Sequence, residues 1–183
     1  KYRKFGTPML VDLLNDAGAF PTRYWSKGTS KHRNAINATA MQEIMDVKPH
    51  ACRHCPVACG KLSTVKSGPH AGLTIEGPEY ETVWAHGPNC GIDDLDAIAR
   101  MDRLDDDIGL DTIEMGATIA VAMDGGLLPF GTAGCTGAWG RASQPAKAVA
   151  DAAPLPFACS PPGRATTGLR SEPDLLLNHR YLR

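Results

Sequence analysis

Three cysteines within eight residues constrain this chain more than any other feature of its sequence. They are Cys52, Cys55 and Cys59, at C-x2-C-x3-C spacing in the stretch His50 to Gly60. A helix or a tight turn can bring three such thiols to one side, where their thiolates repel one another unless a cation accepts them. Clustered thiolates select zinc or iron–sulfur clusters. The spacing therefore predicts a metal site in this stretch.

Two kinds of metal site fit this spacing. An iron–sulfur cube takes four cysteines, often three close together and one from elsewhere. A structural zinc would need a fourth ligand nearby, which His50 or His54 could supply, although zinc fingers usually place their second ligand pair further along the chain. We favour the cluster and keep zinc as the alternative. A third interpretation is three reduced thiols in a loop, because cysteine often packs as a small apolar residue.

The composition excludes several classes of protein. The 183 residues are 43% hydrophobic, and the net charge is −1 with a pI near 6.6, whereas a nucleic-acid-binding domain would be basic. No apolar run reaches the length of a membrane span, and no signal peptide is visible at Lys1. Six cysteines without a secretion signal favour a reducing, cytoplasmic compartment over a disulfide scaffold. Cys90, Cys135 and Cys159 are isolated and are expected to be packed or free thiols, and His86 is expected to be structural.

Helical periodicity dominates the first 130 residues. Apolar residues recur every three or four positions from Ile92 to Ile108, which predicts an amphipathic helix with an acidic outer face that Gly109 ends. Asp111 is suited to cap a further helix that runs through Met123. We also expect a helix opened by Thr7 as cap and Pro8, helices over residues 34–45 and 79–85, and two short strands over residues 61–66 and 73–76.

These patterns predict a mainly α, multi-helical domain over residues 1–130 that includes a short β-hairpin. Residues 141–183 hold six of the 14 prolines and show no sustained period. We therefore expect residues 131–183 to form an irregular, disordered C-terminal tail.

The junction between the two long predicted helices is acidic. Asp105, Asp106 and Asp107 crowd the C-terminal end of the first helix, where the dipole disfavours negative charge, and Asp111 opens the next, where it is favoured. A pterin-like ring could meet these carboxylates with N–H donors, and a divalent cation would also fit. From the residues alone, a solvated acidic face is the favoured interpretation.

Together these elements resemble the tungsten-containing aldehyde ferredoxin oxidoreductase family. The resemblance runs from about Phe5 to Phe130 and corresponds to the helical middle domain of that family. It rests on the order and combination of several motifs. These are Gly6-Thr7, Gly18…Phe20-Pro21-Thr22-Arg23, Cys52-x2-Cys55-Pro56-x2-Cys59-Gly60, Gly77-Pro78-Glu79-Tyr80-Glu81-Thr82, Gly87-x-Asn89-Cys90-Gly91-x-Asp93-Asp94 and Asp106-x2-Gly109-Leu110-Asp111-Thr112.

The resemblance implies two cofactors. In the family the clustered cysteines bind a [4Fe–4S] cluster, which assigns Cys52, Cys55 and Cys59 to that role. The D-x-x-G-L-D element of the family binds a tungsten or molybdenum bis-pterin cofactor. The family's glutamate near the metal matches Glu81, which makes it a candidate catalytic base. The implied cofactor-binding residues are Asp106, Leu110, Asp111 and Thr112, which reverses the interpretation of the junction as a solvated face.

The resemblance also implies an activity. The family oxidises aldehydes, or related carbonyl compounds, to acids and passes the electrons to ferredoxin or another iron–sulfur protein. It places the fourth cluster cysteine and a sheet-rich first domain in segments that this sequence lacks, so we expect a fragment that is inactive alone. The alternative from another class is a non-catalytic zinc-binding or interaction module.

Overall fold

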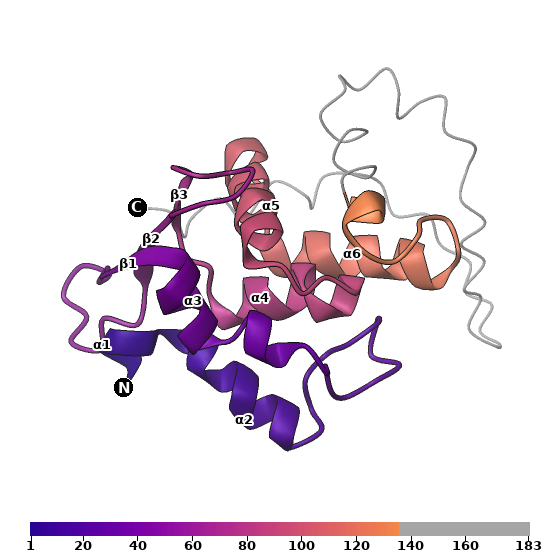
Figure 1. Cartoon of the computed structure of the whole chain (residues 1–183), viewed down its shortest axis with the longest axis horizontal. Helices are drawn as coiled ribbons and strands as arrows, with labels where there is room; N and C mark the ends of the chain where they lie inside the picture. Colours follow the sequence, from indigo (N-terminus) through magenta and orange to yellow (C-terminus); the bar gives the residue numbers. More distant parts are fainter. Residues whose placement is uncertain (136–183) are drawn as a thin grey trace, which may run out of the picture. The chain divides into compact units, whose positions relative to one another are not determined.

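Helices, with one small sheet on one side of them, make up the part of the chain that the structure describes. The computed structural model describes residues 1–135 (Figure 1). A mainly α fold, predicted from the sequence, is confirmed. The elements are α1 (Tyr2–Phe5), η1 (Thr7–Met9), α2 (Leu10–Asp16), η2 (Arg33–Ala35), α3 (Ala38–Ile44), β1 (Met45–Pro49), β2 (Lys61–Val65), β3 (Thr74–Glu76), α4 (Tyr80–His86), η3 (Pro88–Cys90), α5 (Leu95–Ile108) and α6 (Thr112–Asp124).

The sheet has three antiparallel strands in the order β1-β2-β3. Strand β2 pairs with β3 in a register that sets Ser63 opposite Ile75, so the predicted hairpin is confirmed. Strand β1 pairs with the other edge of β2, with Met45 opposite Val65 and Pro49 opposite Lys61. The loop of residues 50–60 therefore joins two paired strand ends and carries all three clustered cysteines.

The prediction of one helix over residues 34–45 is wrong at both ends. Helix α3 begins only after Asn37, whose side-chain oxygen accepts hydrogen bonds from the N–H groups of Thr39 and Ala40. Its C-terminal end comes at Ile44, and Met45 already belongs to β1. From Met45 the sequence alternates apolar and polar residues, and pairing with β2 favours the strand over a longer helix.

Helix α5 ends where the sequence predicts, in a Schellman motif. Gly109 takes the left-handed conformation at φ 72°, and its N–H donates to the carbonyl of Asp106. The N–H of Leu110 donates to the carbonyl of Asp105 at 2.9 Å. This pair of bonds satisfies two carbonyls at the end of the helix and turns the chain directly into α6.

Helix α4 lies in the middle of the described part, and α6 crosses it closely (Figure 1). A Cβ on Gly116 would lie 2.6 Å from the carbonyl carbon of Ala85, so only glycine allows this approach. Thr112 lies one turn before Gly116 on α6, and Thr82 lies one turn before Ala85 on α4. The crossing therefore sets the first turns of the two helices against each other.

The core lies where these helices meet the sheet. Its largest fully buried apolar side chains come from separate segments of the chain, and each stabilises the fold by about 1.5–3 kcal/mol. They include Phe20, Ile36, Met41, Met45, Leu95, Ile98 and Ile119. No helix within residues 1–135 is long and apolar enough to cross a membrane.

The predictions for the tail concern mostly residues outside the described part. Residues 136–183 are not described, so an irregular tail over residues 131–183 and a domain boundary at residue 130 stay predictions.

Candidate metal and cofactor site

The cysteine loop is held at its base and by one tight turn. The N–H of His50 donates to the carbonyl of Gly60 at 2.9 Å, which continues the β1–β2 pairing into the loop. The N–H of Cys55 donates to the carbonyl of Cys52 at 3.0 Å, so the first two cysteines flank a turn. Cys52 is exposed, and Cys55 and Cys59 are half-buried.

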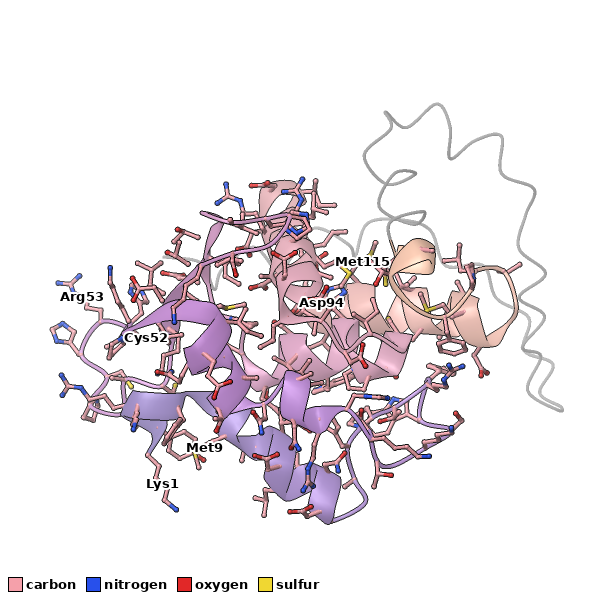
Figure 2. The ribbon with its side chains drawn as sticks, viewed as in Figure 1. Lys1, Met9, Cys52, Arg53, Asp94 and Met115 are labelled. Carbon is pink, nitrogen blue, oxygen red and sulfur yellow. The ribbon has the colours of Figure 1, made fainter. Side chains whose placement is uncertain are left out.

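Two residues of this loop have left-handed backbone conformations. They are His54 at φ 63° and Ala58 at φ 50°, and neither is glycine. Figure 2 shows Arg53 pointing outward from the loop beside Cys52. Within residues 1–135, no three His, Cys, Asp or Glu side chains are gathered closely enough to hold a metal ion. The three thiols thus share one loop, and their convergence on one cluster stays a prediction.

One candidate for a fourth zinc ligand, His50, lies beside a carboxylate. Nε2 of His50 lies 2.7 Å from Oε1 of Glu76 on β3. This contact leaves Nδ1 of His50 for a metal, and a zinc-bound histidine commonly pairs its other ring nitrogen with a carboxylate. The three thiols of the loop fit three corners of an iron–sulfur cube, and His50 or His54 could still complete a zinc site.

The acidic junction presents its predicted cofactor-binding residues at the surface. Asp106, Leu110 and Asp111 are exposed, and 44% of Leu110 is accessible to solvent. Asp111 caps α6, as predicted: its Oδ1 accepts hydrogen bonds from the N–H groups of Ile113 and Glu114 at 2.9 and 3.0 Å. Both of these bonds go to one carboxylate oxygen, so the other oxygen could accept a bond from a ligand.

The candidate base Glu81 is connected to this junction through its neighbour. Glu81 is half-buried in the first turn of α4. The hydroxyl of Thr82 lies 3.1 Å from the hydroxyl of Thr112, the first residue of α6. The structure therefore brings the turn that carries Glu81 next to the predicted cofactor-binding element, whereas the cysteines lie on a separate loop.

The start of α4 is also tied to the N-terminal segment. The hydroxyl of Thr7 donates to the Glu79 carboxylate and accepts a hydrogen bond from the N–H of Tyr80 at 2.8 Å. Thr7 was predicted to cap the helix that follows it, and this is wrong, because its side chain makes no cap bond there. Its hydroxyl instead holds two residues at the first turn of α4.

The predicted acidic outer face of α5 is wrong for three of its carboxylates, those of Asp96, Asp102 and Asp105. Asp105 is fully buried, and its Oδ2 lies 2.5 Å from Nε2 of His86. Burial raises the pKa of Asp105; the nearby His86 opposes this, and the negative charge of Asp106 adds to it. His86 thus has the structural role expected of it, in a buried pair that joins α4 to α5.

Asp102 is another buried carboxylate of α5. Only 4% of the residue is exposed, and its Oδ2 lies against Gly77, where a Cβ would come within 2.9 Å. No hydrogen-bond partner within residues 1–135 reaches that oxygen. Burial raises the pKa of Asp102 to about 7; the charges of Asp106, Asp105 and Glu79 add to this, and a hydrogen bond with Thr82 opposes it.

Two cysteines predicted to be isolated instead meet. Cys90 and Cys135 are both fully buried, and a hydrogen bond between their side chains, with burial, raises the pKa of the Cys90 thiol. The Cys90 thiol also donates to the carbonyl of Ala85 at 3.3 Å. Both are packed thiols, as expected, but they form a pair.

Sequence reasoning missed three residues that shape these sites, namely Thr82, Asp102 and Lys61. Lys61 is 1% exposed, and a signal for it was present. Alternate residues of β2 face the core, and Lys61 lies on the same side of the strand as Ser63 and Val65. Asp102 also had a signal, because it lies seven residues after Leu95 and four after Ile98, on the buried stripe of α5.

Comparison with known proteins decides the family. The family model described as "Aldehyde ferredoxin oxidoreductase, domains 2 & 3" matches residues 1–153. The chain belongs to the aldehyde ferredoxin oxidoreductase family. The resemblance drawn from the motifs is therefore confirmed.

Members of this family with curated names extend the comparison. A "Tungsten-containing aldehyde ferredoxin oxidoreductase" of Thermococcus kodakarensis is 40% identical over 121 residues, which are 66% of this chain and 19% of that protein. The protein of the same name in Pyrococcus furiosus is 39% identical over 121 residues, which are 66% of this chain and 19% of that protein. An "Aliphatic sulfonate oxidoreductase, WOR-like subunit" of Pyrococcus furiosus is 33% identical over 126 residues, 67% of this chain and 20% of that protein. The chain spans about a fifth of the length of these relatives.

Proposed function

We propose that this chain is the cluster- and cofactor-binding part of a tungsten- or molybdenum–pterin oxidoreductase. The whole enzyme would oxidise an aldehyde, or a related carbonyl compound, to an acid and pass electrons to ferredoxin or another iron–sulfur protein. The observation that carries the proposal is the contact between Thr82 and Thr112. It joins the turn of Glu81 to the element that begins at Asp106.

The residues present fit the two groups. Cys52, Cys55 and Cys59 supply three of the four thiolates that a [4Fe–4S] cluster takes, and a cysteine outside the matched segment would supply the fourth. The exposed carboxylates of Asp106 and Asp111 would accept charge-assisted hydrogen bonds from pterin N–H groups. When bound, the metal–pterin supplies the two-electron chemistry, and the cluster passes the electrons on one at a time.

Glu81 would act as general base. Oxidation of an aldehyde to an acid adds the oxygen of a water molecule to the carbonyl carbon and releases two protons and two electrons. A carboxylate next to that water takes up one of the protons and thereby strengthens the attacking oxygen. Glu81 is half-buried, on a turn that Thr7 holds at one end and Thr112 supports from α6.

The names of the relatives support a substrate class. Those with the higher identity carry aldehyde in their names, whereas the sulfonate oxidoreductase shares a lower identity over a similar length. We therefore place aldehydes first and other carbonyl compounds second.

A chimera tests this function. The matched 121-residue segment of the Thermococcus kodakarensis relative is replaced by the corresponding segment of this chain, and tungsten, iron and aldehyde oxidation are measured. We expect the chimera to hold both metals and to turn over. Glu81→Gln should abolish turnover and leave tungsten and iron in place, whereas Glu114→Gln, exposed in the first turn of α6, should behave as wild type. A Glu81→Gln chimera with full activity would reject the role of Glu81, and a chimera without tungsten would contradict the proposed cofactor.

A further inference from the structure

A buried lysine lies directly under the cysteine loop. Lys61 follows the loop as the first residue of β2, and 1% of it is exposed. Its Nζ lies within hydrogen-bond distance of four backbone carbonyl oxygens. These belong to Cys59 at 2.6 Å, Gly60 at 3.0 Å, Tyr2 at 3.1 Å and Ala58 at 3.3 Å.

Three of these carbonyls are consecutive and belong to the Cys59 arm of the loop. Turning them toward one atom requires an unusual backbone, and Ala58 is left-handed at φ 50°. A left-handed conformation at a residue other than glycine costs about 1–2 kcal/mol. Such a conformation persists only where its surroundings over-determine it, and hydrogen bonds to a buried ammonium meet this condition. Lys61 therefore shapes the backbone that carries Cys59.

The charge of Lys61 is not neutralised by a direct ion pair. Within residues 1–135, no carboxylate oxygen lies within 4.0 Å of its Nζ. The charge lies beside three loop carbonyls, two residues along the chain from a predicted thiolate ligand. A buried cation next to an iron–sulfur cluster stabilises the more negative, reduced state of the cluster, and charge and hydrogen bonding set cluster potentials.

We propose that Lys61 is a positioning residue of the cluster site, which fixes the Cys59 arm of the loop through its carbonyls and raises the reduction potential of the cluster. The second half of this inference rests on the proposed function. The first half concerns the loop alone, so the two can fail separately.

The test compares Lys61→Met with Lys66→Met in the full 183-residue chain. Lys66 is a matched control: it follows β2 at the other end, and its Nζ also donates to carbonyl oxygens, those of Gln42 and Glu43 at 3.0 Å, but it is exposed. Hydrogen exchange of the His50 and Cys55 amides reports on the loop without any metal. Anaerobic reconstitution of the same variants in the chimera, whose remaining part would supply the fourth cysteine, followed by a potentiometric titration, reports on the cluster.

We expect Lys61→Met to speed exchange of the two loop amides by tenfold or more, while Lys66→Met and the amides of α5 stay as in wild type. We expect the potential of the reconstituted cluster to fall in Lys61→Met and to stay close to wild type in Lys61→Arg and Lys66→Met. If Lys61→Met loses protection throughout α5, Lys61→Gln replaces it, because glutamine removes the charge and keeps a donor.

Unchanged loop exchange overturns the positioning role, and an unchanged potential overturns the electrostatic role. A chimera with the wild-type segment that takes up no iron contradicts the proposed function and with it the electrostatic role, whereas the exchange measurement on the chain still decides whether Lys61 holds the loop.

Discussion

Asp102 gives a prediction whose sign and size both follow from its surroundings. Its carboxylate is 4% exposed, its Oδ2 lies against Gly77, and three negative residues add to the effect of burial. Replacing it by asparagine keeps the shape of the protonated side chain and removes the charge. Asp102→Asn should therefore stabilise the fold wherever the wild-type side chain is forced to ionise.

The magnitude comes from linkage. The pKa of Asp102 is about 7 in the folded chain against an ordinary value of 3.8. Because the folded state holds the proton more tightly, the stability that this group contributes is fully present below pH 3.8 and is lost as the pH rises to about 7. Each tenfold difference in acidity is worth about 1.4 kcal/mol, so the whole loss is on the order of 4 kcal/mol. About a third of this loss of stability has occurred by pH 5, and all of it by pH 8.

Urea denaturation at pH 5 and pH 8 measures this effect. The stability difference between Asp102→Asn and wild type should increase by roughly 2–3 kcal/mol in favour of the variant from pH 5 to pH 8. The control is Asp107→Asn, an exposed position on the same helix whose carboxylate pairs with Arg103. It should show no such increase. If Asp102→Asn destabilises the chain equally at both pH values, Asp102 is ionised and satisfied throughout, and the reasoning is refuted.

Two further predictions concern α6. Gly116→Ala should destabilise the chain by about 1–3 kcal/mol in urea denaturation, because the new methyl group would meet the backbone of Ala85; a neutral result would show that α4 and α6 can separate without cost. Asp111→Ala should cost about 1 kcal/mol through loss of the cap, whereas Asp111→Asn should cost little. In the chimera, Asp111→Asn should lower tungsten content, and full occupancy there would leave Asp111 only its role as cap.

The sequence alone predicted the helix ends and the hairpin, because these depend on hydrogen bonds between residues close together in the chain. The end of α5 at Gly109 and the start of α6 at Asp111 each depend on hydrogen bonds within a few residues, so the sequence alone contained them. The β2–β3 hairpin is likewise local. The motif that contains Glu81 was also recognised from the sequence, but the contact between Thr82 and Thr112 was not, and the catalytic role of Glu81 stays a prediction.

The sequence could not predict contacts that depend on packing between distant segments. Whether Asp105 faces water or His86 depends on how α5 packs on α4, and a run of acidic residues looks the same in either case. Thr7 could satisfy its hydroxyl in its own helix or, as it does, at Glu79 across 72 positions of sequence. Strand β1 was missed because its pairing with β2 outweighs local helical preference.

The central claim is that Cys52, Cys55 and Cys59 hold an iron–sulfur cluster, and metal analysis tests it most directly. The chimera with the wild-type segment, whose remaining part would supply the fourth cysteine, and each of its Cys→Ser variants are reconstituted anaerobically, and iron, acid-labile sulfide and zinc are measured together. Cys90→Ala serves as control, because Cys90 is buried against Cys135. We predict iron and sulfide in the wild type and control, and their loss in each of the three loop variants. Iron and sulfide retained in all three variants, or one zinc and no sulfide in the wild type, would contradict the claim.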